Sequence, residues 1–169
     1  WRFLRLRPQN FPHIRIAQLA HLYYEQRAGL SQLLECESVK QVRELLATQV
    51  TRYWETHYVF GEDSIKSEKK LSAGSLNLLI INTVAPILFA YGKHKNSEKY
   101  CERAFDFLET LKAEENHIVR MWKEVGLMVE TAGDSQALIQ LKKEYCDRKD
   151  CLRCRIGYEY LKGSSSIKV

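Results

Sequence analysis

The sequence has little proline and glycine, and it lacks the motifs of the common enzyme classes. Only 3 prolines and 8 glycines occur in 169 residues, which leaves little room for long loops or low-complexity segments. There is no Gly-rich phosphate-binding loop, no H-E-x-x-H zinc motif and no G-x-S-x-G nucleophile elbow. The sequence therefore indicates a helical protein and names no catalytic residue.

A long hydrophobic run and a secretory signal are also missing. The most apolar run, Leu76 to Tyr91, is interrupted by Asn77, Asn82 and Pro86 and falls short of the ~20 residues of a membrane span. The first residues show no apolar core followed by a cleavage site. We therefore expect a buried central helix at this run, no membrane partner and a cytoplasmic location.

Neither charge nor size is extreme. The net charge is +5, from 26 Lys and Arg against 21 Asp and Glu, which permits an anionic partner without requiring one. Apolar residues make up 45% of the chain and charged residues 28%, as in ordinary soluble proteins. A chain of 169 residues can bury the core of one domain without disulfides.

Apolar residues recur at helical spacing along most of the chain, and the polar stretch 60–75 is the best candidate for a loop. We predict an all-α fold: an irregular bundle of about seven helices in one domain, 1–169, with 162–169 as a frayed tail. Pro86 is expected to kink or split the helix that contains it. The expected helices span about 12–27, 38–57, 75–91, 98–111, 112–126, 134–146 and 154–161.

Three of the five cysteines lie close together, as C-x4-C-x2-C at Cys146, Cys151 and Cys154. An odd number with this clustering argues against a disulfide framework and favours a reducing compartment. Thiolates are soft donors that bind zinc or iron, and a C-x2-C pair lets two of them converge on one ion. The cluster is therefore a candidate metal site that lacks a local fourth ligand.

The fourth ligand would have to be remote, with Cys101 the first choice and Cys36 the second. Zinc is the first metal to consider, and the plant-type ferredoxin spacing makes an iron–sulfur cluster the alternative. A third hypothesis has no metal, with three reduced thiols closing the packing of a helix–turn–helix. The scattered histidines are further remote candidates: His13, His21, His57, His94 and His117.

Basic residues gather where the first long helix is expected to begin. Arg5, Arg7 and Arg15 flank a rigid turn with Asn10 between two prolines. Arginine forks suit phosphate or carboxylate, so this corner could bind nucleic-acid backbone or dock a partner. The alternative is structural, with the same arginines in ion pairs inside the protein.

Four stretches resemble one uncharacterised bacterial family, DUF2851, common in Bacteroidetes. The most specific motifs of this resemblance are R-P-x-N-x-P-x-x-R, at Arg7 to Arg15, and Y-C-x4-C-x2-C, at Tyr145 to Cys154. The resemblance implies a C-terminal portion of a longer protein, whose missing N-terminal portion would be a partner, and it implies no activity. The four stretches are "RLRPQNFPHIRIAQLA", "YWETHYVFG", "LLIINTVAPILFAYG" and "DSQALIQLKKEYCDRKDCLRCRIG".

Two functional hypotheses follow. In the first, the chain is a helical module of a larger bacterial protein, with a structural metal site on the cysteines and a basic docking corner at Arg5, Arg7, Asn10 and Arg15. In the alternative, it binds or processes nucleic acid, with a zinc or iron–sulfur site and an active site completed by the missing portion.

Overall fold

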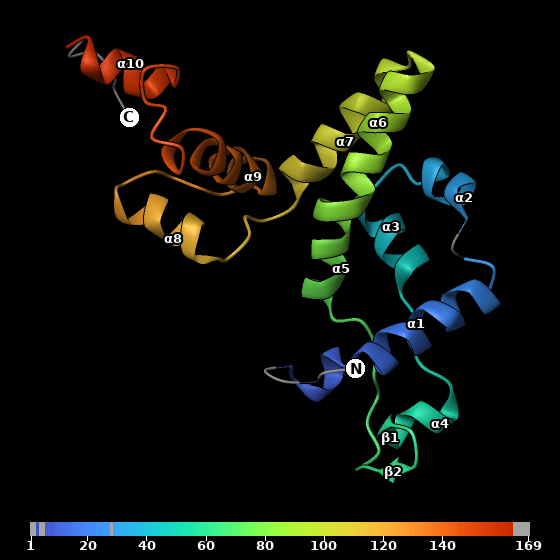
Figure 1. Ribbon diagram of the computed structural model, residues 1–169. Helices are drawn as coiled ribbons and strands as arrows, with labels where there is room; N and C mark the ends of the chain where they lie inside the picture. The colour runs from blue at the N-terminus through green and yellow to red at the C-terminus, as the bar shows by residue number, and fades with distance from the viewer. Residues whose placement is uncertain (1–2, 4–5, 28, 164–169) are drawn as a thin grey trace. The chain divides into compact units, whose positions relative to one another are not determined.

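The computed structural model describes residues 3, 6–27 and 29–163 (Figure 1). The chain is 63% helical with a single two-stranded hairpin in its described part, which confirms the all-α prediction. Arg5 and most of the expected tail lie outside the described residues. The chain divides into two compact units, Trp1–Ala104 and Phe105–Val169; that they fold as one domain stays a prediction.

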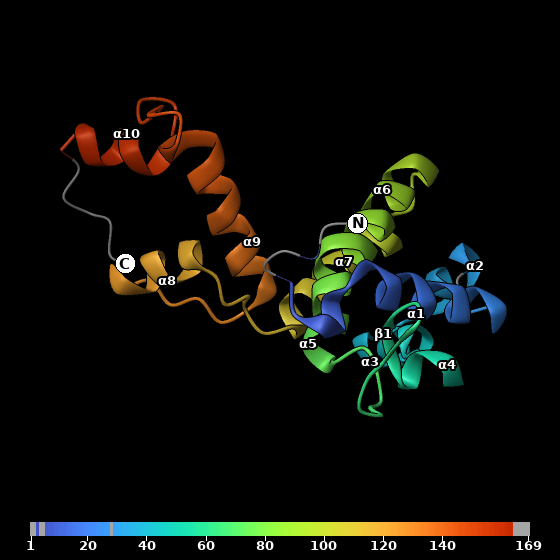
Figure 2. The same ribbon diagram turned by 60° about the horizontal axis from the view of Figure 1, so that its bottom comes forward.

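The first unit holds the elements up to the start of α7. The β-hairpin and α4 lie together on one side of α1 (Figure 2). In chain order the elements are the 3-10 turn Pro8–Asn10, α1 (Pro12–Tyr24), α2 (Leu30–Glu35), α3 (Val39–Leu46), α4 (Arg52–Glu55), β1 (His57–Val59), β2 (Glu62–Asp63), α5 (Ala73–Leu79), a π-helical turn (Ile80–Val84), α6 (Ala85–Lys95) and α7 (Glu98–Thr110).

The expected helix 38–57 is wrong, because it is two helices with an extended segment between them. α3 starts at the N-cap Ser38, whose Oγ accepts from the Gln41 amide, and it ends at Ala47, which is extended. The next residues include β-branched Thr48 and Val50, which disfavour helix. Val50 packs into the core of the first unit, with Ile14 and Ala17 of α1 and the partly buried Phe11, Trp54 and Tyr58.

The apolar helix extends beyond the expected range 75–91 at both ends, and it runs through Pro86 without being split there. It begins after the N-cap Ser72 and runs through Lys95, with the π turn absorbing the irregularity. Asn82 in this turn donates from Nδ2 to the Leu78 carbonyl oxygen, 3.0 Å away. The amide therefore satisfies a carbonyl within the helix, as a polar side chain in an apolar helix requires.

This helix bears on the membrane expectation. In the described part of the chain, one helix, Ala73–Lys95, is long and apolar enough to span a bilayer, with a mean hydropathy of 1.7 over its best window. Of that window 33% is buried, and length and composition alone are weak evidence. The absence of a membrane partner therefore stays a prediction.

The second unit is built on short helices with well-defined starts. Asn116 caps α8 by accepting from the Ile118 and Val119 amides, and Thr131 caps α9 by accepting from the Asp134 amide. A single antiparallel bridge joins Lys112 to Thr131. Its elements are α8 (His117–Glu124), α9 (Ala132–Leu141), a π turn (Lys142–Cys146) and α10 (Arg155–Leu161).

Candidate binding site

The Arg-Pro-Gln-Asn-Phe-Pro stretch folds as the sequence suggests and aims Asn10 at Arg15. Pro8 opens a short 3-10 turn, and Pro12 stands at the start of α1, where its fixed φ and missing N–H are tolerated. One turn into α1, Arg15 donates from Nη2 to Asn10 Oδ1 at 2.6 Å and from Nη1 to Gln18 Oε1 at 2.9 Å. The predicted grouping of Asn10 with Arg15 is therefore present in the structure.

Gln18 holds the Arg15 guanidinium in place through its own buried side chain. Its side chain is buried and donates from Nε2 to the Lys69 carbonyl oxygen at 2.7 Å. The amide thus has a partner for both its oxygen and its nitrogen, between Arg15 and the segment that leads to α5. A buried amide with defined partners holds one orientation, so it fixes the Arg15 guanidinium as well.

The partners of Arg15 are neutral. In the part of the chain that the structure describes, no carboxylate lies within ion-pair distance of Arg7 or Arg15. Of the five N–H donors of a guanidinium, the two amides take one each, and three remain. The hypothesis that internal ion pairs occupy these two arginines finds no support among the described residues.

A polar pocket of about 240 Å³ lies around this corner. Besides the arginines it holds the hydroxyls of Ser72 and Ser75 and the side chain of Lys70, which pairs with exposed Glu68 at 2.9 Å. An exposed pair of this kind contributes little and is easily exchanged for another anion. The pocket therefore offers several donors and an excess of positive charge.

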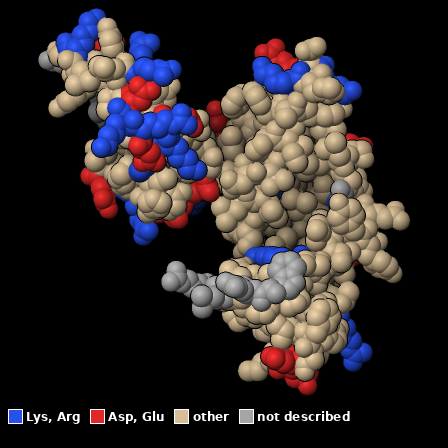
Figure 3. Space-filling view, in the orientation of Figure 1, with Lys and Arg blue, Asp and Glu red and all other residues tan. Residues whose placement is uncertain are grey.

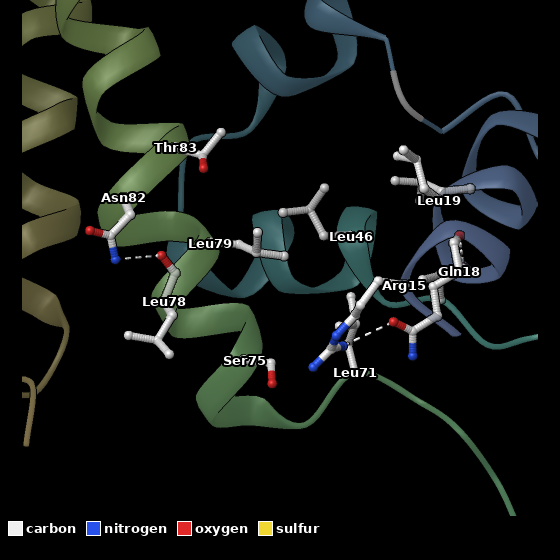
Figure 4. Close-up of a pocket in the computed structure, with 12 residues that line it drawn as sticks. Arg15, Gln18, Leu19, Leu46, Leu71, Ser75, Leu78, Leu79, Asn82 and Thr83 are labelled. Carbon is white, nitrogen blue, oxygen red and sulfur yellow. Dashed lines mark hydrogen bonds between the residues drawn. The ribbon is translucent and has the colours of Figure 1, made fainter. Parts of the chain in front are cut away.

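A larger, apolar groove of about 540 Å³ adjoins it, between α1, the end of α3 and the start of the long helix (Figure 4). Arg15, Gln18 and Ser75 line both spaces, and Figure 4 shows Arg15 reaching from α1 toward α5. Half of the twelve residues that line the groove are leucines: Leu19, Leu22, Leu46, Leu71, Leu78 and Leu79.

The charge distribution on this face agrees with the residues that line the groove. On the first unit, Figure 3 shows a broad area without charged side chains, hollowed in its lower part, with basic atoms at one edge of the hollow. Among the described residues that line the groove, Arg15 alone is charged. The site is therefore apolar along its length and cationic at one end.

The clustered cysteines lie at a chain reversal in the second unit. Cys146 ends the π turn and is exposed, Cys151 is exposed, and Cys154 is buried at the N-cap of α10. A Cβ at Gly157 would lie 2.6 Å from the Cys151 carbonyl oxygen, so only glycine lets this loop pack on α10. Among the described residues, no three His, Cys, Asp or Glu side chains are grouped to hold a metal ion, so the site stays a prediction.

The two remote thiols have packing roles in the first unit. Cys101 is buried, with Sγ 3.7 Å from the Phe89 carbonyl oxygen, and it faces Gly92, where a Cβ would lie 2.7 Å from that sulfur. Cys36 Sγ donates to the Gln32 carbonyl oxygen at 3.3 Å, and burial raises the pKa of its thiol. Both thiols behave as core residues rather than as exposed ligands.

Sequence reasoning located the arginine end of the site and missed its apolar part. Helical spacing of the apolar residues predicts the helix 12–27 but not that Leu19 stays exposed and lines a groove. Gln18 carried a signal that could have been used: a polar residue on that apolar face, three positions after Arg15, suits a helical side-chain pair.

Comparison with known proteins gives one match. Residues 1–117 match the family described as "Protein of unknown function (DUF2851)". Neither the curated proteins nor the solved structures yield a match. The matched segment contains the arginine corner, the groove and the whole of the first unit. The chain therefore belongs to the DUF2851 family.

Proposed function

We propose that the first unit is a binding module that recognises an anionic group, a carboxylate or a phosphate, at its basic corner. One observation carries the proposal: Arg15 is held by two neutral amides and keeps three N–H donors for a ligand. Here the partners orient the guanidinium without neutralising it.

The neighbouring groups support the same chemistry. Arg7 and Lys70 add positive charge to the pocket, and the Ser72 and Ser75 hydroxyls, hydrogen-bonded to each other at 3.0 Å, leave one O–H as a further donor. Charge-assisted hydrogen bonds to a planar guanidinium are among the stronger polar contacts available to a protein. The corner thus has the donor set of a carboxylate or phosphate site, as a docking corner of a larger cytoplasmic protein would need.

Titration of the full chain with acetate and with inorganic phosphate tests the proposal. The readout is the side-chain Nε–H resonances of the arginines in ¹H–¹⁵N spectra. We expect the Arg15 resonance to shift with saturation, and we expect no saturable shift elsewhere to survive Arg15→Gln. Arg52→Gln, which changes an exposed arginine of α4, is the matched control and should leave the titration unchanged. A titration in which the Arg15 resonance stays fixed would refute the proposal.

Nucleic acid is the alternative anion. It would use the same guanidinium through its phosphates, and its binding would weaken steeply with salt. Binding of single-stranded or duplex DNA that depends on Arg7 and Arg15 at low salt would favour it over a small carboxylate or phosphate ligand.

The cysteine cluster is a separate proposal for the second unit, as a structural zinc site or, as the alternative, an iron–sulfur site. The C-x2-C spacing of Cys151 and Cys154, at a chain reversal whose Cys151 backbone packs against Gly157 of α10, supports it. Metal analysis of the purified protein, described below, tests it.

A further inference from the structure

We infer that the ligand of the basic corner is a single-chain anionic amphiphile, whose charged end meets Arg15 and whose hydrocarbon chain lies in the leucine groove. The inference rests on the proposed function, because it assigns the anion to Arg15. It adds the chemical class of the rest of the ligand.

The first argument is continuity. Arg15, Gln18 and Ser75 belong to the walls of both the polar pocket and the apolar groove, so a ligand held by Arg15 has the leucines directly beside it. The groove volume of about 540 Å³ falls within the range of about 300–1,000 Å³ that is usual for small-molecule sites. A small inorganic anion would leave this space empty.

The second argument is that leucine side chains lining the groove are exposed. Leu19 of α1 is 53% exposed, and Leu79, which points from the long helix into the groove in Figure 4, is 38% exposed. Covering such apolar surface is favourable, and contiguous exposed apolar surface marks binding sites. A hydrocarbon chain covers it without bringing polar groups that would need partners, whereas an extended peptide would bring its backbone N–H and C=O groups.

The third argument is the irregular wall opposite α1. Asn82 and Thr83 line the groove from the π-helical turn Ile80–Val84. One N–H of the Asn82 amide donates to the Leu78 carbonyl oxygen, within the same helix. Single π turns within α-helices are frequent at functional sites, and this one faces the groove.

A homologous series of alkyl carboxylates tests the inference directly. The full 169-residue chain is titrated by calorimetry with hexanoate, octanoate, decanoate and dodecanoate, each below its micelle concentration. We expect the affinity to rise about fourfold per added methylene and then to level off when the groove is full. Decyl phosphate beside decanoate distinguishes a phosphate head from a carboxylate head.

Two matched variants of α1 locate the chain. Leu19→Asn changes a residue that lines the groove, and Ile16→Asn changes one of nearly equal exposure, 50%, that does not line it. We expect Leu19→Asn to weaken dodecanoate about tenfold and to flatten the dependence on chain length, and Ile16→Asn to leave both unchanged. Because both side chains are half-exposed, circular dichroism should show both variants folded.

The outcomes separate the inference from the proposed function. Affinity that ignores chain length but is lost in Arg15→Gln overturns the amphiphile and leaves the anion site standing. Affinity that rises with chain length equally in wild type and Arg15→Gln overturns both, as does the absence of any binding. Binding to anionic vesicles without binding of monomeric amphiphile overturns the inference in favour of a membrane surface.

Discussion

Replacement of Lys69 by methionine should destabilise the first unit by an amount that the structure allows us to work out. The side chain is 3% exposed, and its ammonium donates to the carbonyl oxygens of Glu55 and His57, each at 3.0 Å, and to that of Trp54. The same ammonium lies 4.0 Å from the centre of the Tyr58 ring. It therefore ties α4 and β1 to the segment before α5.

Methionine keeps most of the aliphatic part of the side chain and removes only the ammonium donor. The loss in the free energy of unfolding therefore measures the contribution of the ammonium hydrogen bonds. A carbonyl left without its partner costs about 1–3 kcal/mol. The three residues concerned are half-buried, so water reaches them in part and the low end applies. Burial also lowers the pKa of the Lys69 ammonium, which shows that desolvation offsets part of the gain. We expect a loss of about 2–3 kcal/mol in the free energy of unfolding.

Urea denaturation at neutral pH, followed by tryptophan fluorescence, measures this loss, and thermal denaturation should show a fall in Tm of roughly 4–12 °C. Lys66→Met is the matched control, because Lys66 is largely exposed and pairs with Glu55 on the surface. It should change the free energy of unfolding by less than about 0.5 kcal/mol. If Lys69→Met were as mild as Lys66→Met, the interpretation of Lys69 as a buried tie between the two segments would be refuted.

Three further changes have defined outcomes. Hydrogen bonds from the Thr131 and Glu130 amides lower the pKa of Asp134, so the stabilisation that its carboxylate gives is present above pH ~4 and lost as pH falls below that value. Asp134→Asn should therefore reduce the loss of stability at acid pH, measured as denaturation midpoints across pH. An unchanged acid dependence would refute this role of Asp134. Gly92→Ala should lower the free energy of unfolding by about 1–3 kcal/mol in urea titrations, because its Cβ would lie 2.7 Å from Cys101 Sγ and 2.9 Å from a backbone oxygen; wild-type stability would contradict the close packing. Protein purified under reducing, anaerobic conditions should contain about one equivalent of zinc or iron. The metal should be lost in Cys154→Ser and kept in Cys36→Ala. A metal content of the wild-type protein below about 0.2 equivalents would exclude the site.

The part of the fold that sequence predicts well is the part set by local chemistry. The stretch from Arg7 to Arg15 contains two prolines that fix φ and a capping position that starts a helix, so its geometry follows from neighbours in the chain. The hydrogen bond of Arg15 to Asn10 spans only five residues and belongs to the same local stretch. The start of α3 is equally local, because the N-cap Ser38 accepts from the Gln41 amide three residues on.

The part that sequence predicts poorly depends on partners far along the chain. The break after α3 needs Arg27, which donates from Nη1 to the Ala47 carbonyl oxygen at 2.9 Å and also binds that of Glu44. The position of Gln18 needs the Lys69 carbonyl, 51 residues away. Periodicity marks which residues are apolar, but it does not show which leucines will be covered, so the groove was hidden within a predicted core.

The contrast among the cations is the strongest reason to treat Arg15 as a binding residue. Lys69, Arg27 and Arg103 each donate to backbone carbonyls where a helix ends: Lys69 after α4, Arg27 after α3, and Arg103 after α2, at 2.7 Å from the Leu34 oxygen. Carbonyls at a helix C-terminus lack intrahelical donors, and a cation satisfies them and complements the helix dipole.

Arg15 differs from these cations in each respect. It stands in the first half of α1, its partners are side-chain amides, and it opens onto two joined pockets. A net charge of +5 therefore says little about binding by itself, since several of the positive charges hold helices together. What distinguishes the candidate ligand-binding cation is its place in the walls of both the polar pocket and the apolar groove. A variant that supplies Arg15 with an internal carboxylate at exposed Asn10, Asn10→Asp, should therefore weaken anion binding in the acetate titration while leaving the fold intact.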